Sequence, residues 1–426
     1  MKKIINLSII TIMMLFYTNK IVAQSPNTDA LFSTAFVDEF DSIRLNNWGV
    51  LYGWGMFSNS NTTTTLITNG PGPVCPGSPN FPCAIAGYNN NFSDTNNFKL
   101  RNNAGLTYLR LTTKQETPYK PMKVWKKFYN CGYPLCNNPC WGSYCLHDST
   151  EYFKYSTGML ASQRVVKYGY IEIRFRLPEL DNPTFAINTY LTSGPTFWMF
   201  GNTSAQPYSE LDIYEISAND CRYTNNWHAT SYVTSNNPYP NQTIFPAEPD
   251  HHINVGQWHT AGVNWTPKYL DYYLDDALVR RSDRDSVALL DSMHIYIDNF
   301  VPNFIGCFGI DSVNTPFPIH YDIDYVKVWQ PALDCANDKV YTNVTQASYA
   351  PKIYKSLMMS GVGYNATFTS GFTHFAANNG IELYEGFEVS GSGTALLETL
   401  PCFTGMTTAF KPPINQPPPP NLHKPY

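Results

Sequence analysis

Short runs of alternating apolar and polar residues, broken by Gly, Pro, Asn and Asp, recur from about residue 32 to residue 330 of this 426-residue chain. The clearest run covers residues 168–178, where Ile171, Ile173, Phe175 and Leu177 occupy every second position. Alternate side chains of a β-strand point to opposite faces, so this run predicts a strand with one face in a core. Because no long helical periodicity interrupts the runs, they predict an all-β sandwich or barrel.

Three further segments predict neighbouring strands of this domain. Residues 260–265 and 269–274 are joined around Pro267, and Asp275-Asp276 then forms a turn before residues 277–280 continue the meander. Residues 321–329 predict the strand that closes the domain.

Residues 210–215 read Glu-Leu-Asp-Ile-Tyr-Glu, with three carboxylates inside an otherwise strand-like apolar stretch. In a regular strand Glu210 and Asp212 share a face, and Glu215 lies on the other face. One extra residue, a β-bulge around Ile213-Tyr214, returns Glu215 to the face of the other two acids, and bulges are enriched next to active sites. We therefore predict a bulge here and a row of three acids.

A row of three acids with no functional role would destabilise the fold, because neighbouring like charges disfavour ionisation. It suits the hydrolysis of glycosidic bonds, since retaining glycosidases place two carboxyl groups about 5 to 5.5 Å apart, one as nucleophile and one as proton donor. A middle acid can share a proton or hydrogen bond with a neighbour and separate the titrations of the two glutamates. The alternative interpretation is a solvated edge strand whose acids have no catalytic task.

The first residues have the features of an export signal. Lys2 and Lys3 precede an apolar run from residue 4 to residue 17, and a small residue, Ala23, stands before Gln24. This pattern predicts a signal peptide over residues 1–23 and a mature chain that begins at Gln24. We expect a secreted or cell-surface protein with no membrane span after signal removal; a retained membrane anchor is the alternative.

Composition favours a neutral polar ligand. Charged residues make up 14% of the chain, aromatic residues 15%, and the formal net charge is −5. No basic stripe or nucleic-acid-binding motif is present, so we expect no nucleic-acid partner. Many Tyr, Trp, Asn and Thr residues in an exported chain suit a polysaccharide partner, although an adhesin would have the same composition. We expect the protein to act as a monomer.

Ten cysteines in an exported chain predict disulfide bonds. Four of them, Cys131, Cys136, Cys140 and Cys145, lie in one Gly/Pro/Asn-rich stretch. Zinc is the alternative for these four, but the paired C-x2-C spacing of zinc sites is missing. Loops cross-linked by disulfide bonds are therefore the favoured interpretation.

The chain changes character after the large domain, which we place at residues 24–333. Residues 336–405 predict a small β-rich module with more small residues and a different turn spacing. Residues 411–426 are Pro-rich and predict an extended tail.

Several segments, in the same order as in the family, make the large domain resemble glycoside hydrolase family 16, the laminarinase, agarase and carrageenase superfamily. The resemblance implies a concanavalin-like β-jelly roll. It covers nearly 300 residues, and the 210–215 segment has the bulged form E-x-D-x-x-E rather than the shorter form of the lichenases. The segments that carry it are Val37–Asp41 with Asn47-Trp48, Tyr168–Phe175, Pro195–Met199, Glu210–Glu215, Trp258–Pro267 and Asp324–Trp329.

By this resemblance Glu210 is the nucleophile, Glu215 the acid/base and Asp212 the helper acid between them. Trp198 matches an aromatic residue of the substrate cleft, where a flat ring suits the C–H face of a pyranose, although a tryptophan there can equally belong to the core. His228 matches a histidine that hydrogen-bonds a sugar or the nucleophile, with a purely structural role as the alternative.

The resemblance implies no required cofactor and no metal in the catalytic site. Family members often carry a structural calcium ion on the convex side, and Glu39 and Asp324 lie in the segments that would supply its ligands.

The chain departs from the family pattern in places that bear on the substrate. Gly194 stands where many laminarinases have Trp, which weakens a direct β-1,3-glucanase assignment. The stretches 69–87 and 131–145 are long, and such loops usually decide which polymer is accepted. A sulfated galactan would require basic groups, for which Arg222 is a candidate, although an ordinary surface arginine is the simpler interpretation.

The small module resembles a β-stack unit found near the C-termini of secreted bacterial proteins, in which it serves attachment or spacing. The resemblance rests on residues 353–356, 376–389 and 391–393. Cys335 and Cys402 flank the module, and we predict a disulfide bond between them.

Together these features predict a secreted retaining endo-glycosidase that hydrolyses β-linked polysaccharide of the β-1,3-glucan or galactan type. The alternatives are a non-catalytic carbohydrate-binding or adhesive protein, and a transglycosylase.

Overall fold

The computed structural model describes most of the large domain and much of the small module. Both the predicted signal peptide, 1–23, and the Pro-rich tail, 411–426, lie outside the described residues. The described residues include one 3-10 helix, η1 (Pro26–Thr28), and no helix in them has the length and hydropathy to cross a membrane. They are 25–49, 86–89, 95–128, 145–177, 194–201, 209–216, 223–229, 243–244, 256–282, 292–300, 317–341, 344–345, 352–359, 366–368, 372–383, 387–390, 394–400 and 407–410.

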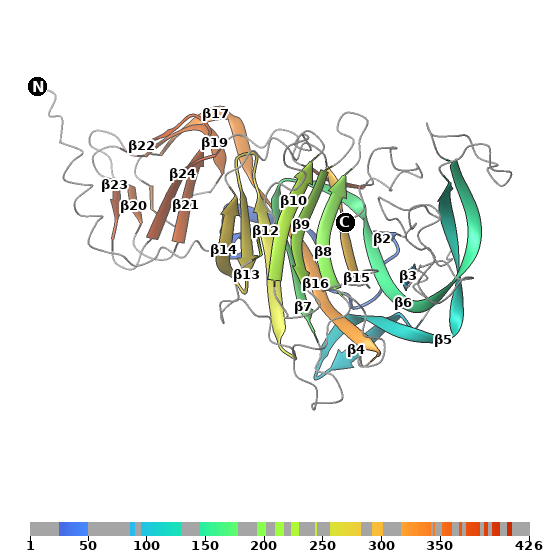
Figure 1. The fold of residues 1–426 in the computed structure, drawn as a ribbon. Helices are drawn as coiled ribbons and strands as arrows, with labels where there is room; N and C mark the ends of the chain where they lie inside the picture. The colour runs from blue at the N-terminus through green and yellow to red at the C-terminus, as the bar shows by residue number, and fades with distance from the viewer. Residues whose placement is uncertain are drawn as a thin grey trace, which may run out of the picture.

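Two layers of antiparallel strands pack face to face, and hydrogen bonds link their strands into one 17-stranded sheet that closes over a core (Figure 1). The fold is thus the all-β jelly-roll sandwich that the sequence predicts. The first layer contains β1 (Phe32–Asp38), β4 (Phe98–Asn103), β5 (Leu106–Phe128), β16 (Ile319–Pro331), β7 (Gly169–Arg176), β12 (Trp258–Trp265), β13 (Leu270–Leu274) and β14 (Ala277–Ser282). The second contains β6 (Cys145–Lys167), β15 (Met293–Phe300), β8 (Gly194–Gly201), β9 (Ser209–Ile216), β10 (Tyr223–Ala229) and β11 (Thr243–Ile244), with the short strands β2 (Trp48–Gly49) and β3 (Ala86–Asn89) along β6.

Strand β7 confirms the predicted alternation. Ile171, Ile173 and Phe175 are fully buried in the core between the two layers. The polar residues between them face the other way, where Glu172 accepts hydrogen bonds from the hydroxyls of Tyr170 (2.7 Å) and Tyr325 (2.8 Å). Burial of apolar surface stabilises a fold by about 25 cal/mol per Å², so these side chains help to hold the two layers together.

The predicted turn between β13 and β14 is also confirmed. Asp275 and Asp276 both have positive φ, 49° and 62°, as a type I′ hairpin turn requires. Aspartate tolerates this left-handed region better than most residues, so the local sequence determines the hairpin.

The small module has parallel strands, unlike the sandwich. Its strands form one five-stranded and one three-stranded sheet, and successive strands of each sheet lie side by side in the same direction, as in stacked rungs. The division of the chain into domains at the predicted residues stays a prediction. The strands are β17 (Leu333–Tyr341), β18 (Val344–Thr345), β19 (Ile353–Met359), β20 (Ala366–Phe368), β21 (Phe372–Ala377), β22 (Ile381–Leu383), β23 (Phe387–Val389) and β24 (Thr394–Thr399).

The chain returns to the sandwich after the module. Strand β25 (Thr407–Phe410) pairs with β6 in antiparallel register, with Thr407 opposite Lys167 and Phe410 opposite Arg164. Of the two cysteines predicted to form a disulfide across the module, Cys335 packs against the core and Cys402 lies outside the described residues. The pairing stays a prediction.

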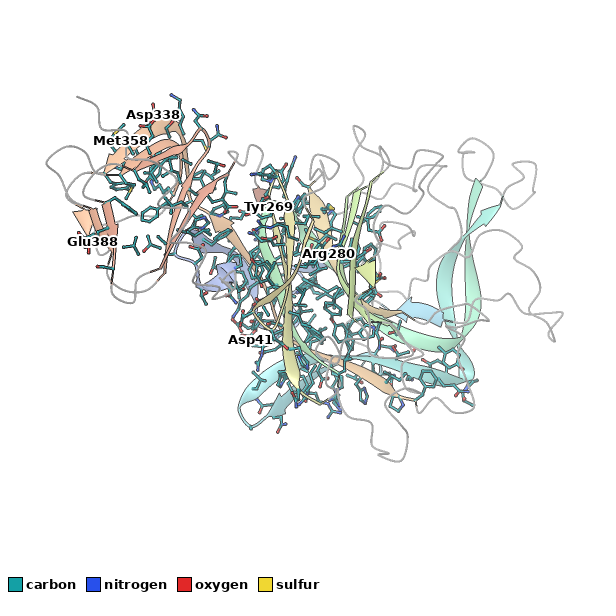
Figure 2. The ribbon with its side chains drawn as sticks, turned by 60° about the vertical axis from the view of Figure 1, so that its left-hand side comes forward. Asp41, Tyr269, Arg280, Asp338, Met358 and Glu388 are labelled. Carbon is teal, nitrogen blue, oxygen red and sulfur yellow. The ribbon has the colours of Figure 1, made fainter. Side chains whose placement is uncertain are left out.

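A buried ionic cluster joins the module to the sandwich. His374 on β21 contacts Asp29, 345 positions away, through Nδ1 at 2.7 Å, and its Nε2 lies 3.3 Å from Oε2 of Glu398. Glu398 also accepts a hydrogen bond from Tyr269, which lies at the end of the sandwich next to the module (2.8 Å; Figure 2). Although burial favours the neutral imidazole, the two carboxylates raise the pKa of His374 to about 9.

We predict that His374→Gln destabilises the protein and that the loss depends on pH. The pKa of His374 rises from its ordinary value of 6.5 to about 9, which corresponds to roughly 3 kcal/mol in the free energy of unfolding. Because the pKa is raised in the folded state, this stabilisation is complete below pH 6.5 and is lost as the pH rises through 9. Urea unfolding of wild type and variant at pH 6 and pH 10 measures it.

His320→Gln is the control for the loss of an imidazole, because His320 hydrogen-bonds the neutral hydroxyl of Thr112 at 3.1 Å. If wild type and His374→Gln differed in free energy of unfolding by the same amount at both pH values, the ionic interpretation would be contradicted.

Candidate active site

Strand β9 carries the predicted bulge. On one side Glu215 pairs with Thr196 and Tyr214 with Phe197, but the next pair along β8 is Trp198 with Asp212, so the register with β8 skips Ile213. The register with β10 shifts at the same place. The extra residue is where the alternation of the sequence predicts it.

The bulge turns two successive apolar side chains into the core. Ile213 and Tyr214 are both 0% exposed, and the ring of Tyr214 stacks on Phe175 with centroids 4.5 Å apart. With both of these inside, Asp212 and Glu215 lie on the opposite side of the strand. Local packing, and not the acids themselves, therefore brings the second glutamate to the side of the first.

The three acids share their face of the sheet with residues of β8 and β15. Residues directly opposite in an antiparallel sheet have side chains on the same face. Figure 1 shows β8, β9 and β10 side by side, and β8 also pairs with β15. We call this side the acid face. Its rows across β9, β8 and β15 are Glu210–Phe200–His294, Asp212–Trp198–Tyr296 and Glu215–Thr196–Asp298.

Two of the three acids are poorly accessible to water. Glu210 is 9% exposed and Asp212 4%, whereas Glu215 is more open.

Aromatic side chains form a separate cluster on the acid face. Trp198 stacks on Tyr296, with centroids 4.6 Å apart and planes at 24°, and meets Phe200 edge-on at 6.2 Å. Its indole N–H donates to Oδ2 of Asp298 at 2.9 Å. The cluster consists of Met159, Ala161, Trp198, Phe200 and Tyr296, apart from the main core.

The structure locates the two predicted substrate-binding residues by their strands. Trp198 lies on the acid face, opposite Asp212, and is 6% exposed, so it belongs to the aromatic cluster and not to the core between the layers. His228 on β10 is opposite Glu210 in the register. Contact of either residue with a sugar stays a prediction.

Sequence reasoning missed the contribution of β15. Asp298 and Tyr296 lie in a run whose apolar partners Ile295 and Ile297 enter the core. The signal was present, because His294, Tyr296 and Asp298 alternate with these residues. What the sequence alone does not show is that this strand lies next to β8.

The residues that would hold a calcium ion have other partners. Glu39 pairs with Lys327 at 2.8 Å, and Asp324 with Arg174. Across the described ranges, no group of His, Cys, Asp and Glu is arranged to hold a metal. A structural calcium ion at these residues stays a prediction.

A comparison with known families finds a match for part of the sandwich. Residues 107–297 match the model described as glycosyl hydrolases family 16, and this interval includes β9 with its bulge and all three acids. This part of the jelly-roll domain is thus similar to glycosyl hydrolases of family 16.

The relatives of the family 16 domain match over part of their length. A beta-glucanase of Acetivibrio thermocellus is 26% identical over 133 residues, 31% of this chain and 34% of the relative. The endo-1,3-1,4-beta-glycanase EglC of Rhizobium meliloti (strain 1021) is 27% identical over 166 residues, 38% of this chain and 32% of the relative. The chain thus spans about a third of the length of these curated relatives.

Among solved structures, the laminarinase from Flavobacterium sp. UMI-01 aligns with a TM-score of 0.41 and 19% identity, over 70% of this chain and 100% of that chain.

The bulge of the family 16 domain predicts how β9 responds to deletions. Deleting Ile213 leaves Glu-Leu-Asp-Tyr-Glu, in which all three acids still alternate onto one face, so we expect a folded protein that loses about 2–5 kcal/mol from the missing core side chain. Deleting Leu211 instead turns Asp212 toward the core, and we expect no stable fold. Thermal unfolding compares the two variants. Equal destabilisation by both deletions would contradict the assigned faces.

Proposed function

We propose that this chain is a secreted retaining endo-glycosidase that hydrolyses β-glycosidic bonds in a polysaccharide by double displacement. The observation that carries the proposal is the bulge at Ile213, which gives Glu210, Asp212 and Glu215 one common face beside Trp198. The family match and the names of the curated relatives support it.

In the first step a carboxylate oxygen of Glu210 attacks the anomeric carbon, while the protonated carboxyl of Glu215 gives its proton to the glycosidic oxygen. The bond between that carbon and oxygen breaks, and the leaving saccharide departs with a hydroxyl group. In the second step Glu215, now a carboxylate, takes a proton from water. The water oxygen forms a bond to the anomeric carbon and releases Glu210, so two inversions give net retention.

Asp212 assists by its position between the two glutamates along the strand. At 4% exposure it lies in a poorly solvated setting, where a proton or hydrogen bond shared with a neighbour has a large effect. A carboxyl that changes partner between the two steps holds Glu210 ready for attack and Glu215 ready to donate.

Both the aromatic cluster and the relatives favour a neutral β-glucan as substrate. Flat rings pack against the apolar C–H faces of pyranoses, and the relatives are named a beta-glucanase and an endo-1,3-1,4-beta-glycanase. Gly194, where many laminarinases have Trp, keeps galactans among the substrates to be tested.

We predict reducing-sugar release from at least one member of a panel of laminarin, mixed-linkage β-glucan, agarose, porphyran and carrageenan. The polymer that is cleaved identifies the substrate class. Tight binding to one of them without any cleavage would support the non-catalytic alternative, and products longer than the substrate would support transglycosylation.

We further predict that Glu210→Ala and Glu215→Ala each lower kcat by more than about 10³-fold, because each removes one of the two reacting carboxyls. Azide should rescue Glu210→Ala by forming a glycosyl azide of inverted configuration, since the small anion occupies the space of the missing carboxylate. NMR of the first products identifies the anomer. Glu382→Ala, an exposed position on β22, is the control. Inverted products from wild type would rule out the mechanism.

A further inference from the structure

Among the described residues, two aspartate–tryptophan pairs share the same kind of hydrogen bond. The indole N–H of Trp48 donates to Asp38 at 2.9 Å, and that of Trp198 donates to Asp298 at 2.9 Å. All four side chains are buried. The two pairs differ in location, because Trp48 belongs to the core between the layers and Trp198 to the aromatic cluster of the acid face.

The Asp38 pair has a structural task. Asp38 also accepts hydrogen bonds from the amide N–H of Phe40 at 3.0 Å and from Asn47 at 2.7 Å, so it ties the loop after β1 to the core. The three acids of β9 pair with residues of β8 and β10, and not with this loop.

The Asp298 pair lies within the rows that contain the acids. Asp298 is opposite Thr196, which is opposite Glu215, while Trp198 is opposite Asp212. The hydrogen bond therefore connects the row of Glu215 to the row of Asp212. Both Asp298 and Trp198 are on strands, whose backbone holds them more rigidly than a loop would.

The stacking of Trp198 on Tyr296 sets the plane of the indole, and the bond to Asp298 sets its rotation within that plane. Stacking alone is tolerant of such rotation, because offset ring arrangements of similar energy are available. A hydrogen bond to a carboxylate is stronger and more directional than a neutral one. Together the two contacts leave the indole one orientation next to Asp212.

We propose that Asp298 is a positioning residue of the active site, which acts through Trp198 by holding the indole in the one orientation that supports a sugar beside the acids of β9. This inference rests on the proposed function. Misplacement of a supporting group by about 1 Å can cost 10²-fold in rate, because the reacting atoms must be aligned before the bond changes begin.

The test compares Asp298→Ala, Asp298→Asn, Trp198→Phe and the double variant Asp298→Ala/Trp198→Phe on the polymer that the full chain cleaves. We expect Asp298→Ala to lower kcat/KM by about 10- to 100-fold, mainly through kcat. Asp298→Asn keeps an acceptor oxygen for the indole N–H and should stay within about threefold of wild type. The double variant should be no slower than the slower single variant, because Asp298 acts through Trp198.

Asp38→Asn is the matched control, and the folded protein should keep wild-type kcat and KM. The near-UV circular dichroism of Trp198, obtained by subtracting the Trp198→Phe spectrum, should change in Asp298→Ala and persist in Asp298→Asn. If Asp298→Ala does not fold, adding Asp298→Asn to Trp198→Phe provides the kinetic test, and no further loss is expected.

Wild-type kinetics in a folded Asp298→Ala protein, or losses that multiply in the double variant, would overturn the inference. So would an unchanged Trp198 spectrum in Asp298→Ala. These outcomes are separate from failure of the proposed function, which Glu210→Ala with azide decides without any change at Asp298, and the spectrum is measured without substrate.

Discussion

One extra residue in strand β9 determines the chemistry available to this molecule. The register with β8 skips Ile213, which fills the core together with Tyr214, so Glu215 lies on the side that Glu210 and Asp212 already occupy. The energy for this irregularity comes from apolar burial on the other side of the strand. A polar site on one face thus depends on hydrophobic packing on the opposite face.

The acid face combines two environments that are usually kept apart. Carboxyl groups need partners or water, whereas the Trp198, Tyr296 and Phe200 rings exclude water. Placing them in adjacent rows makes the electrostatic interactions among the acids stronger than they would be in solvent. Asp298 belongs to both environments, because it is a buried carboxylate whose partner is an indole.

The sequence predicts most of what depends on neighbours along the chain. The alternation in β7, the turn at Asp275-Asp276 and the bulge near Ile213 are all confirmed, because period, turn chemistry and local crowding are properties of a few consecutive residues. The placement of β15 beside β8 and the contact of His374 with Asp29 were not predicted. Both depend on strand order, and one sequence does not show which distant strands become neighbours.

The return of β25 to β6 changes how the small module is attached. The segment leaves the sandwich after β16 and re-enters it at β25, so the module is an insertion between two strands of one sheet rather than an appendage on a single tether. The two connections and the ionic cluster at His374 attach it to the sandwich at three places. A module connected in this way at both ends has less freedom to rotate relative to the acid face than one joined by a single linker.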